Sequence, residues 1–204
     1  KKYLSFGIIP FAILNGEARV MDFKKGSYWQ PIVPSVKTST NTLVNIKIEN
    51  NGTTNIRSRV VKKGYDALLL KATLNATSKK GYLENLESEN DFIINDYKEK
   101  GAANKDALIT QSFDITSNSQ ELSSNRLYLN VFFYDKIITN PFKLESRFYP
   151  VNFGYKFNNS FRANINVPEN YVVTNLPESK AFSLPNNGGA FLFNCKKIGN
   201  KIIV

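Results

Sequence analysis

Alternation of apolar and polar side chains is the clearest pattern in this chain, and it begins near residue 43. Residues 44–49 read Val-Asn-Ile-Lys-Ile-Glu, a period of two that is typical of a strand with one face in the core and one in water. Asn-Asn-Gly at 50–52 is a turn signal. Residues 55–62 then predict the returning strand of a hairpin, with Ile56 and Val60 inward and Arg57 and Arg59 outward.

The period changes after residue 64, which indicates helix. Five apolar residues share one helical face: Tyr65, Leu68, Leu69, Ala72 and Ala76. Ser78 is a residue type that favours helix N-termini, so we expect it to cap a second helix running to about residue 88. That second helix would turn Tyr82, Leu83 and Leu86 inward.

Strand patterns resume after the helices. They cover residues 92–98 and 108–116, where Ile109, Phe113 and Ile115 share a face. Residues 127–134 are apolar on both faces and predict a central strand.

The last third of the chain reads as strand and turn throughout. Alternation at 161–167 is followed by predicted strands at 171–176, 181–184, 190–197 and 201–204, with turns at 185–189 and at Gly199-Asn200. Short strands at this spacing predict a mainly β fold, α+β overall. We expect antiparallel β-sandwich units with one or two short helices in the first half.

These patterns divide the chain into three parts. Residues 1–36 are expected to be irregular, because Pro10, Pro31 and Pro34 interrupt any long element. Residues 37–142 predict a β-rich strand–helix–strand unit. Residues 143–204 predict a small C-terminal β-sandwich domain.

Composition excludes several kinds of chemistry. The 204 residues include no histidine and one cysteine, so neither a Ser-His-Asp nor a Cys-His catalytic set can be assembled within the chain. A Cys/His zinc site and an internal disulfide are excluded for the same reason. We expect no cofactor and no metal.

The net charge of +10 does not by itself indicate a nucleic-acid partner. Lysines number 21, arginines six and asparagines 26, a combination typical of an AT-rich genome. The basic residues are scattered as single residues and pairs, whereas nucleic-acid-binding proteins concentrate them on one face with aromatics between. We therefore expect a solvated surface and no nucleic-acid partner.

No run of about 18 apolar residues occurs, so no transmembrane segment is expected. Residues 1–7 lack the long apolar region of a secretion signal and an initiator methionine, which predicts a processed or partial chain.

Single reactive side chains give weak signals. Cys195 is in phase with Phe191 and Phe193, which predicts a buried, inert thiol. The carboxylates are dispersed and lack the spacing of a calcium loop. A hydrolase that uses two converging carboxylates stays open, on the condition that two of them lie within about 10 Å in one cleft.

The aromatic segment 148–157 is denser in rings than a two-faced strand requires. Tyr149, Phe153 and Tyr155 are our candidate ligand-binding residues, lining a groove for a peptide or a glycan. The alternative interpretation is a packed edge between two β-layers.

The same segment carries a family resemblance, together with turns further along the chain and short motifs upstream. The residues concerned are 6–10, 14–20, 64–67, 140–143, 147–155, 168–171, 176–177, 184–191 and 199–202. Element by element they resemble the C-terminal side of bacterial transglutaminase-like proteins, which ends in a β-domain of unknown function. Such proteins often carry a cysteine before the Leu-Asn-Gly motif of residues 14–16, where this chain has Ala12 and Ile13.

The resemblance implies that residues 1–36 correspond to the exit from a papain-like transglutaminase core. The catalytic Cys, His and Asp of such a core would precede residue 1, so none is assigned here. The chain would be a non-catalytic accessory region that packs on the core or shapes its cleft, in an exported, periplasmic or cell-envelope protein. The core would be its partner, and the parent protein a transglutaminase-like enzyme or a cysteine peptidase. The alternative function is a peptide- or glycan-binding β-module that uses the 148–157 segment.

Overall fold

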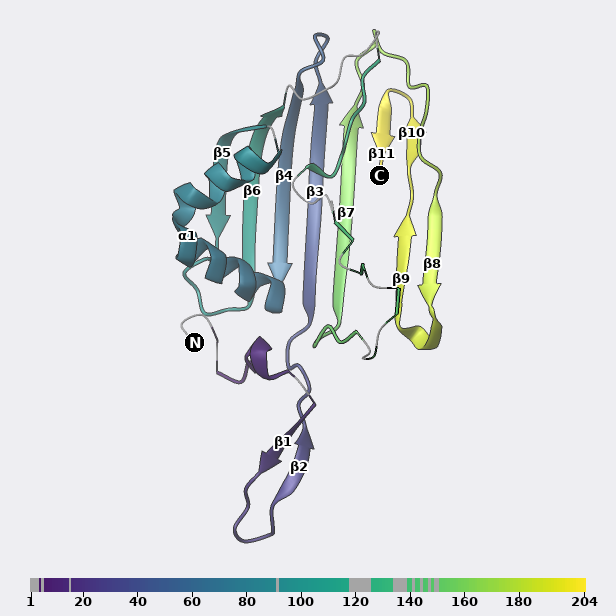
Figure 1. Ribbon diagram of the computed structural model, residues 1–204. Helices are drawn as coiled ribbons and strands as arrows, with labels where there is room; N and C mark the ends of the chain where they lie inside the picture. The colour runs from purple at the N-terminus through teal and green to yellow at the C-terminus, as the bar shows by residue number, and fades with distance from the viewer. Residues whose placement is uncertain are drawn as a thin grey trace.

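A twisted sheet of seven strands forms the body of the protein (Figure 1). The computed structural model describes residues 4, 6–14, 16–90, 92–117, 126–133, 139–140, 142–143, 145–146, 148 and 151–204. The strand order is β10-β11-β7-β3-β4-β6-β5, and two two-stranded ribbons, β1-β2 and β8-β9, are separate from this sheet. The predicted mainly β, α+β class is confirmed.

The centre of the sheet is the predicted hairpin and its neighbours. β3 (Thr38–Ile48) and β4 (Thr54–Lys63) are antiparallel, with Ile46 opposite Ile56. β6 (Leu108–Ser117) and β5 (Ile93–Lys100) continue the antiparallel order. The inward side chains of these strands form the core, as their period of two predicts.

A parallel pair joins the C-terminal part of the chain to this hairpin. β7 (Phe157–Asn166) runs parallel to β3, with Ala163 opposite Val44. β11 (Lys201–Ile203) and β10 (Lys196–Ile198) extend the sheet beyond β7 as the predicted Gly199-Asn200 hairpin. We expected antiparallel units, but the sheet is mixed, because β3 and β7 are separated by the long connection that parallel pairing requires. The sheet therefore runs unbroken from strands before residue 143 to strands after it.

A bent helix covers one face of the sheet at β4, β6 and β5 (Figure 1). α1 (Tyr65–Asn90) is interrupted at Ser78, whose φ of 64° and ψ of 161° are not helical. The amide of Gly81 donates to Ser78 Oγ at 3.3 Å, so Ser78 caps the second half as expected. Tyr82, Leu83 and Leu86 pack against the core, which confirms the inward face of that half.

The predicted inward face of the first half of α1 is wrong. Tyr65 is buried, but its buried companions are Ala67, Leu70 and Lys71. Leu69 is 50% exposed, Leu68 is half-buried, and Ala72 and Ala76 face solvent. The helix buries a lysine that binds carbonyl groups of the loop before β6, and a hydropathy pattern cannot place a lysine in the core.

Residues 127–133 do not form the predicted central strand, and residue 134 lies outside the described part. This segment forms no strand of the sheet, since residues 127–130 have no regular secondary structure and residues 131–132 form a turn. Its alternate residues Leu127, Leu129, Val131 and Phe133 pack on the core. Tyr128, between them, is exposed. The segment therefore covers the core with one side only, although its sequence is apolar on both sides. The predicted strand at 171–176 is likewise absent.

The two ribbons lie outside the main sheet. Residues 1–36 contain more order than expected: η1 (Phe11–Ile13) is followed by a hairpin of β1 (Glu17–Val20) and β2 (Tyr28–Pro31), which projects from the body (Figure 1). β8 (Lys180–Leu184) and β9 (Gly189–Phe193) form the second ribbon, joined at η3 (Pro185–Asn187). The predicted 190–197 strand is thus divided between β9 and β10. Within the described part of the chain, no helix is long and apolar enough to span a bilayer.

Candidate binding face

The aromatic segment 148–157 divides between two environments. Tyr149 lies outside the described residues. Tyr155 points inward, where its ring stacks on Tyr65 at a centroid distance of 4.7 Å and meets Phe11 edge-on at 5.7 Å. Phe153 is 56% exposed, and its ring contacts Phe157 at 5.8 Å. The structure therefore does not bring Phe153 into the ring cluster of Tyr155.

Hydrogen bonds fix Tyr155 in place. Its hydroxyl donates to Asp66 Oδ1 at 3.3 Å, and the other oxygen of Asp66 accepts a bond from Thr40 Oγ1 at 2.8 Å. Burial, followed by the nearby charge of Asp66, raises the pKa of the Tyr155 hydroxyl. Tyr65 is fixed in the same way, because its hydroxyl donates to the carbonyl of Ile9 at 2.9 Å. Tyr155 thus joins three parts of the chain, and a ligand-binding role for the segment stays a prediction.

The opposite face of the sheet carries a set of polar side chains. We call it the open face, and it consists of residues on five strands that point away from α1: Leu43, Asn45, Arg57, Arg59, Asp96, Lys98, Ser112, Asp114, Arg162 and Asn164. These residues alternate with buried ones such as Val44, Ser58 and Ala163. Strand alternation places them there, as each buried residue turns its neighbours outward.

Strand register arranges these side chains in two rows across the sheet. The first row runs Arg162, Leu43, Arg59, Ser112 and Lys98, from β7 to β5. The second runs Asn164, Asn45, Arg57, Asp114 and Asp96. The amide of Asn164 donates to Asn45 Oδ1 at 3.0 Å, which links β7 and β3 on this face.

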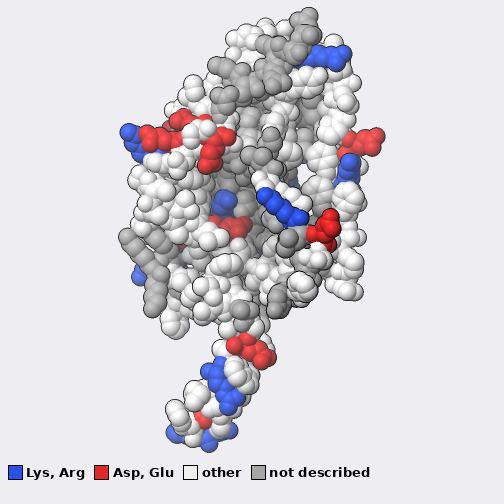
Figure 2. Space-filling view, in the orientation of Figure 1, with Lys and Arg blue, Asp and Glu red and all other residues white. Residues whose placement is uncertain are grey.

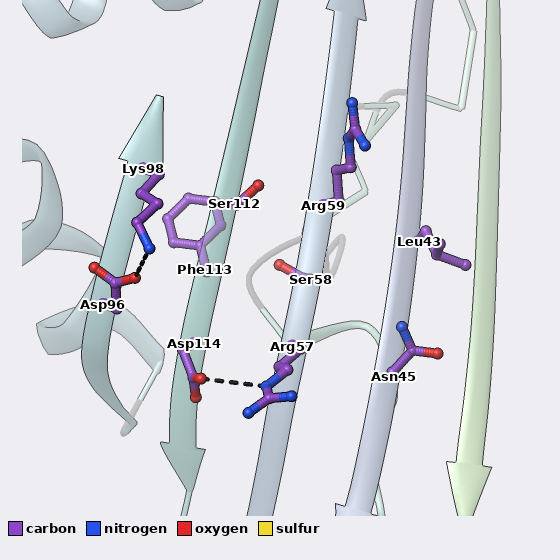
Figure 3. Close-up of a pocket in the computed structure, with 10 residues that line it drawn as sticks. All are labelled: Leu43, Asn45, Arg57, Ser58, Arg59, Asp96, Lys98, Ser112, Phe113 and Asp114. Carbon is purple, nitrogen blue, oxygen red and sulfur yellow. Dashed lines mark hydrogen bonds and ion pairs between the residues drawn. The ribbon is translucent and has the colours of Figure 1, made fainter. Parts of the chain in front are cut away.

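A shallow hollow of about 350 Å³ lies on the open face over β3, β4, β6 and β5 (Figure 3). Ion pairs occupy two of its sides: Lys98 Nζ lies 2.8 Å from Asp96 Oδ2, and Arg57 Nε lies 3.4 Å from Asp114 Oδ2. In Figure 3, Arg59 stands apart from both pairs.

Two carboxylates meet in this hollow, since Asp96 and Asp114 are directly opposite on β5 and β6. This is the proximity that a carboxylate hydrolase would need. However, the hydrogen bond from Lys98 lowers the pKa of Asp96, whereas a general acid needs a raised pKa. The same contact raises the pKa of Lys98. The contact between Asp96 and Lys98 therefore favours the charged form of both groups.

Other reactive groups contribute little to this face. Cys195 is half-buried, and burial raises the pKa of its thiol, which keeps it protonated at neutral pH. Among the described residues, no cluster of three or more His, Cys, Asp or Glu side chains is arranged to hold a metal ion. The chemistry available on the open face is hydrogen bonding and positive charge.

Sequence reasoning missed this face, although it predicted the direction of some of its side chains. Arg57 and Arg59 were predicted to point outward, and Arg162 alternates with apolar residues in the sequence. Their assembly on one face depends on the parallel pairing of β7 with β3, which no local sequence pattern predicts. Lys71 was missed too, because a buried lysine has no hydropathy signature.

Comparisons with known proteins bear on the C-terminal part. Residues 125–204 match the family model of a domain of unknown function with a solved structure (DUF3858). The match begins earlier than the predicted C-terminal domain, at 125 rather than 143, and contains β7 to β11. A search of curated proteins and a search of solved structures each gave no match.

Proposed function

We propose that this chain is a non-catalytic accessory β-region of a transglutaminase-like protein, which packs on the papain-like core and shapes its substrate cleft. The resemblance of its turn and packing motifs supports the proposal, and the match of residues 125–204 to a domain of unknown function supports the placement of the C-terminal part. The absence of histidine from the sequence agrees with catalytic residues supplied by another region. We place the parent protein in the cell envelope or periplasm.

The projecting β1–β2 hairpin is the observation that carries the proposal. Figure 1 shows it extending from the body, and Figure 2 shows charged side chains along it. Large apolar residues are nevertheless exposed on it, including Phe23 at 93% and Trp29 at 59%. A two-stranded ribbon is marginally stable alone, and apolar side chains gathered on such a projection indicate a contact surface. The resemblance supports a position of this hairpin beside the core, and we propose the core as the surface that it contacts.

The first test is the coding sequence upstream of residue 1. The proposal expects a Cys, a His and an Asp in transglutaminase order, and an upstream region without them would contradict it. The second test compares amide hydrogen exchange in the chain alone and in the parent protein. Exchange in β1 and β2 should slow when the core is present.

A matched pair of variants sharpens the second test. Phe23→Ser with Trp29→Ser in the parent protein should restore fast exchange in the hairpin and loosen the core contact. Phe182→Ser with Phe191→Ser, on the β8–β9 ribbon, changes two similarly exposed rings and should leave the hairpin protected. Equal effects of the two pairs would contradict docking through the hairpin.

The alternative function is a peptide- or glycan-binding module, and one observation favours it. Phe148, Phe153 and Phe157 are all more than half exposed, which is apolar surface available to a ligand. N-acetylglucosamine oligomers and a mixed peptide library serve as probes. Binding that is lost on Phe153→Ala without loss of stability would support this function, and retained binding would exclude Phe153 from it.

A further inference from the structure

Arginines gather on the open face in a way that composition does not explain. The 21 lysines are scattered along the chain, which has only six arginines. Three of those six, Arg57, Arg59 and Arg162, lie on this one face. Arginine presents a planar fork of donors that matches a carboxylate, which a lysine ammonium does not.

The spacing of the cations across the first row is regular. Arg162 on β7 and Arg59 on β4 both pair with Leu43 on β3, so the two arginines are two strands apart. Arg59 and Lys98 are again two strands apart, with Ser112 between them. Because neighbouring strands are about 4.8 Å apart, successive cations in this row are separated by about 10 Å.

Much of this charge has no partner within the protein. Asp114 pairs with Arg57, and Asp96 pairs with Lys98. In the part of the chain that the structure describes, no acidic side chain pairs with Arg59 or Arg162. Both arginines are exposed. The open face therefore has a surplus of positive charge centred on Leu43.

We propose that the open face binds an acidic polypeptide segment in a polyproline II conformation, which crosses the strands along the first row. Such a chain has three residues per turn and rises 3.1 Å per residue, so every third side chain points the same way at intervals of about 9.3 Å. This interval matches the distance between successive cations. Carboxylates at every third position reach Arg162, Arg59 and Lys98, and intervening apolar residues contact Leu43.

The side chains of the open face favour a polypeptide over a nucleic acid. Proteins that bind single-stranded nucleic acids stack bases on aromatic rings. The ten residues that define the open face include no aromatic side chain, and Phe113, which also lines the hollow, is 3% exposed and packs in the core. Leu43, exposed between two arginines, supplies an apolar contact that a row of phosphates would leave unused.

Fluorescence anisotropy with the 204-residue chain tests the proposal. The probe is a labelled peptide of Glu-Pro-Pro repeats, and the comparison peptide has the same composition with its glutamates in one block. The repeat peptide should bind more tightly, and its affinity should fall as salt concentration rises. Arg59→Ser with Arg162→Ser should weaken binding about tenfold, the effect of two exposed charge contacts.

Three controls make the result specific. Lys24→Ser with Lys25→Ser, on the β1–β2 hairpin, removes the same charge and should change affinity less than about twofold. Arg59→Lys with Arg162→Lys keeps the charge but loses the fork, so it should weaken binding by an intermediate factor. Far-ultraviolet circular dichroism confirms that each variant is folded.

Several outcomes would overturn the proposal. Equal affinity for the repeat and block peptides would show that the spacing of the glutamates does not matter. If the hairpin variant weakens binding as much as the double arginine-to-serine variant, the peptide does not bind specifically to the open face. Tighter binding of an oligothymidylate or of polygalacturonate would replace the polypeptide with another polyanion. Binding of neither peptide would leave the arginines as solvated surface.

Discussion

The ring of Tyr155 stacks on the ring of Tyr65, with centroids 4.7 Å apart. This contact fastens the segment before β7 to the first turn of α1, and Phe11 closes the cluster from the N-terminal side. Three segments that are far apart in the sequence therefore meet at one ring cluster. The bond from the Tyr155 hydroxyl to Asp66 adds a polar contact on the same helical turn.

Tyr155→Ala should lower the free energy of unfolding by about 2–4 kcal/mol, because it removes both the ring packing and the hydrogen bond. Phe153→Ala, two residues earlier on a side chain that is mostly exposed, should cost less than about 1 kcal/mol. Urea unfolding followed by circular dichroism measures both. Similar losses for the two variants would mean that Tyr155 is not the anchor of this segment.

Gly64→Ala should be among the most damaging small substitutions in the chain. Gly64 has a φ of 65°, and a Cβ there would lie 2.5 Å from Thr38 Oγ1 and 2.7 Å from the carbonyl oxygen of Lys37. Left-handed backbone strain and this clash together should cost about 3 kcal/mol or more. Gly199→Ala is the matched control, since its φ is 58° but nothing lies within 4 Å. It should cost about 1 kcal/mol in the same urea measurement, and equal losses would show that the space around Gly64 relaxes.

Local signals explain which parts of the fold were predictable. The β3–β4 and β10–β11 hairpins follow from alternation and from turn residues, both of which act over a few positions. The parallel pairing of β3 with β7 is not local, because it depends on segments far apart in the chain. Residues 127–133 misled the prediction because a covering segment and a central strand are both apolar on two sides.

The open face likewise combines features that local sequence patterns predict with one that depends on the pairing of distant segments. The outward direction of Arg57 and Arg59 follows from the alternation of a single strand. The row that places Arg162 and Arg59 on either side of Leu43 requires the β7–β3 register. Candidate residues on single strands were therefore predictable, but their assembly into a surface was not.

Lys71→Met should destabilise the protein by about 2–4 kcal/mol, although it replaces a charge with an apolar side chain. Lys71 is 1% exposed. Its Nζ donates to the carbonyl of Asn104 at 2.9 Å and also to the carbonyl of Asp106. Loss of the donor leaves both acceptors without their bond, which costs more than the charge burial it relieves. Lys80→Met, on an exposed side chain of the same helix, should stay within about 0.5 kcal/mol. If Lys71→Met leaves the free energy of unfolding unchanged, water has replaced the ammonium as the donor to these carbonyls.

Stability should fall at alkaline pH because of the buried Tyr97. Its hydroxyl accepts from Gln111 Nε2 at 2.8 Å and donates to Glu99 Oε2 at 2.9 Å, and burial raises its pKa above the usual value of about 10. The folded state holds this proton longer than the unfolded state, so its contribution is complete below pH of about 10. It is then lost as pH rises toward the folded pKa, at up to about 1.4 kcal/mol per pH unit.

The titration of Lys71 changes the free energy of unfolding in the opposite direction at alkaline pH. Desolvation lowers its pKa, so the unfolded state binds more protons and stability rises as pH approaches the usual lysine pKa of about 10.4. Unfolding at pH 8 and at pH 10.8 separates the two groups. Tyr97→Phe should reduce the alkaline loss relative to the wild type, even though it is less stable at pH 8. If Tyr97→Phe loses as much stability between pH 8 and pH 10.8 as the wild type does, other tyrosines cause the loss.

Ser78 gives the sharpest test of how α1 is built. Its φ of 64° and ψ of 161° belong to a region that only glycine enters easily, and its Oγ caps the following turn through the Gly81 amide. Ser78→Ala keeps the strained Cβ and loses the cap, so it should cost about 1 kcal/mol. Ser78→Gly loses the same cap but releases the strain, and it should be at least as stable as the wild type. Ser88→Ala, on an exposed hydroxyl of the same half, should stay within about 0.5 kcal/mol. If Ser78→Gly proves less stable than Ser78→Ala, the interruption is unstrained, and the packing of Tyr82, Leu83 and Leu86 alone holds the second half on the sheet.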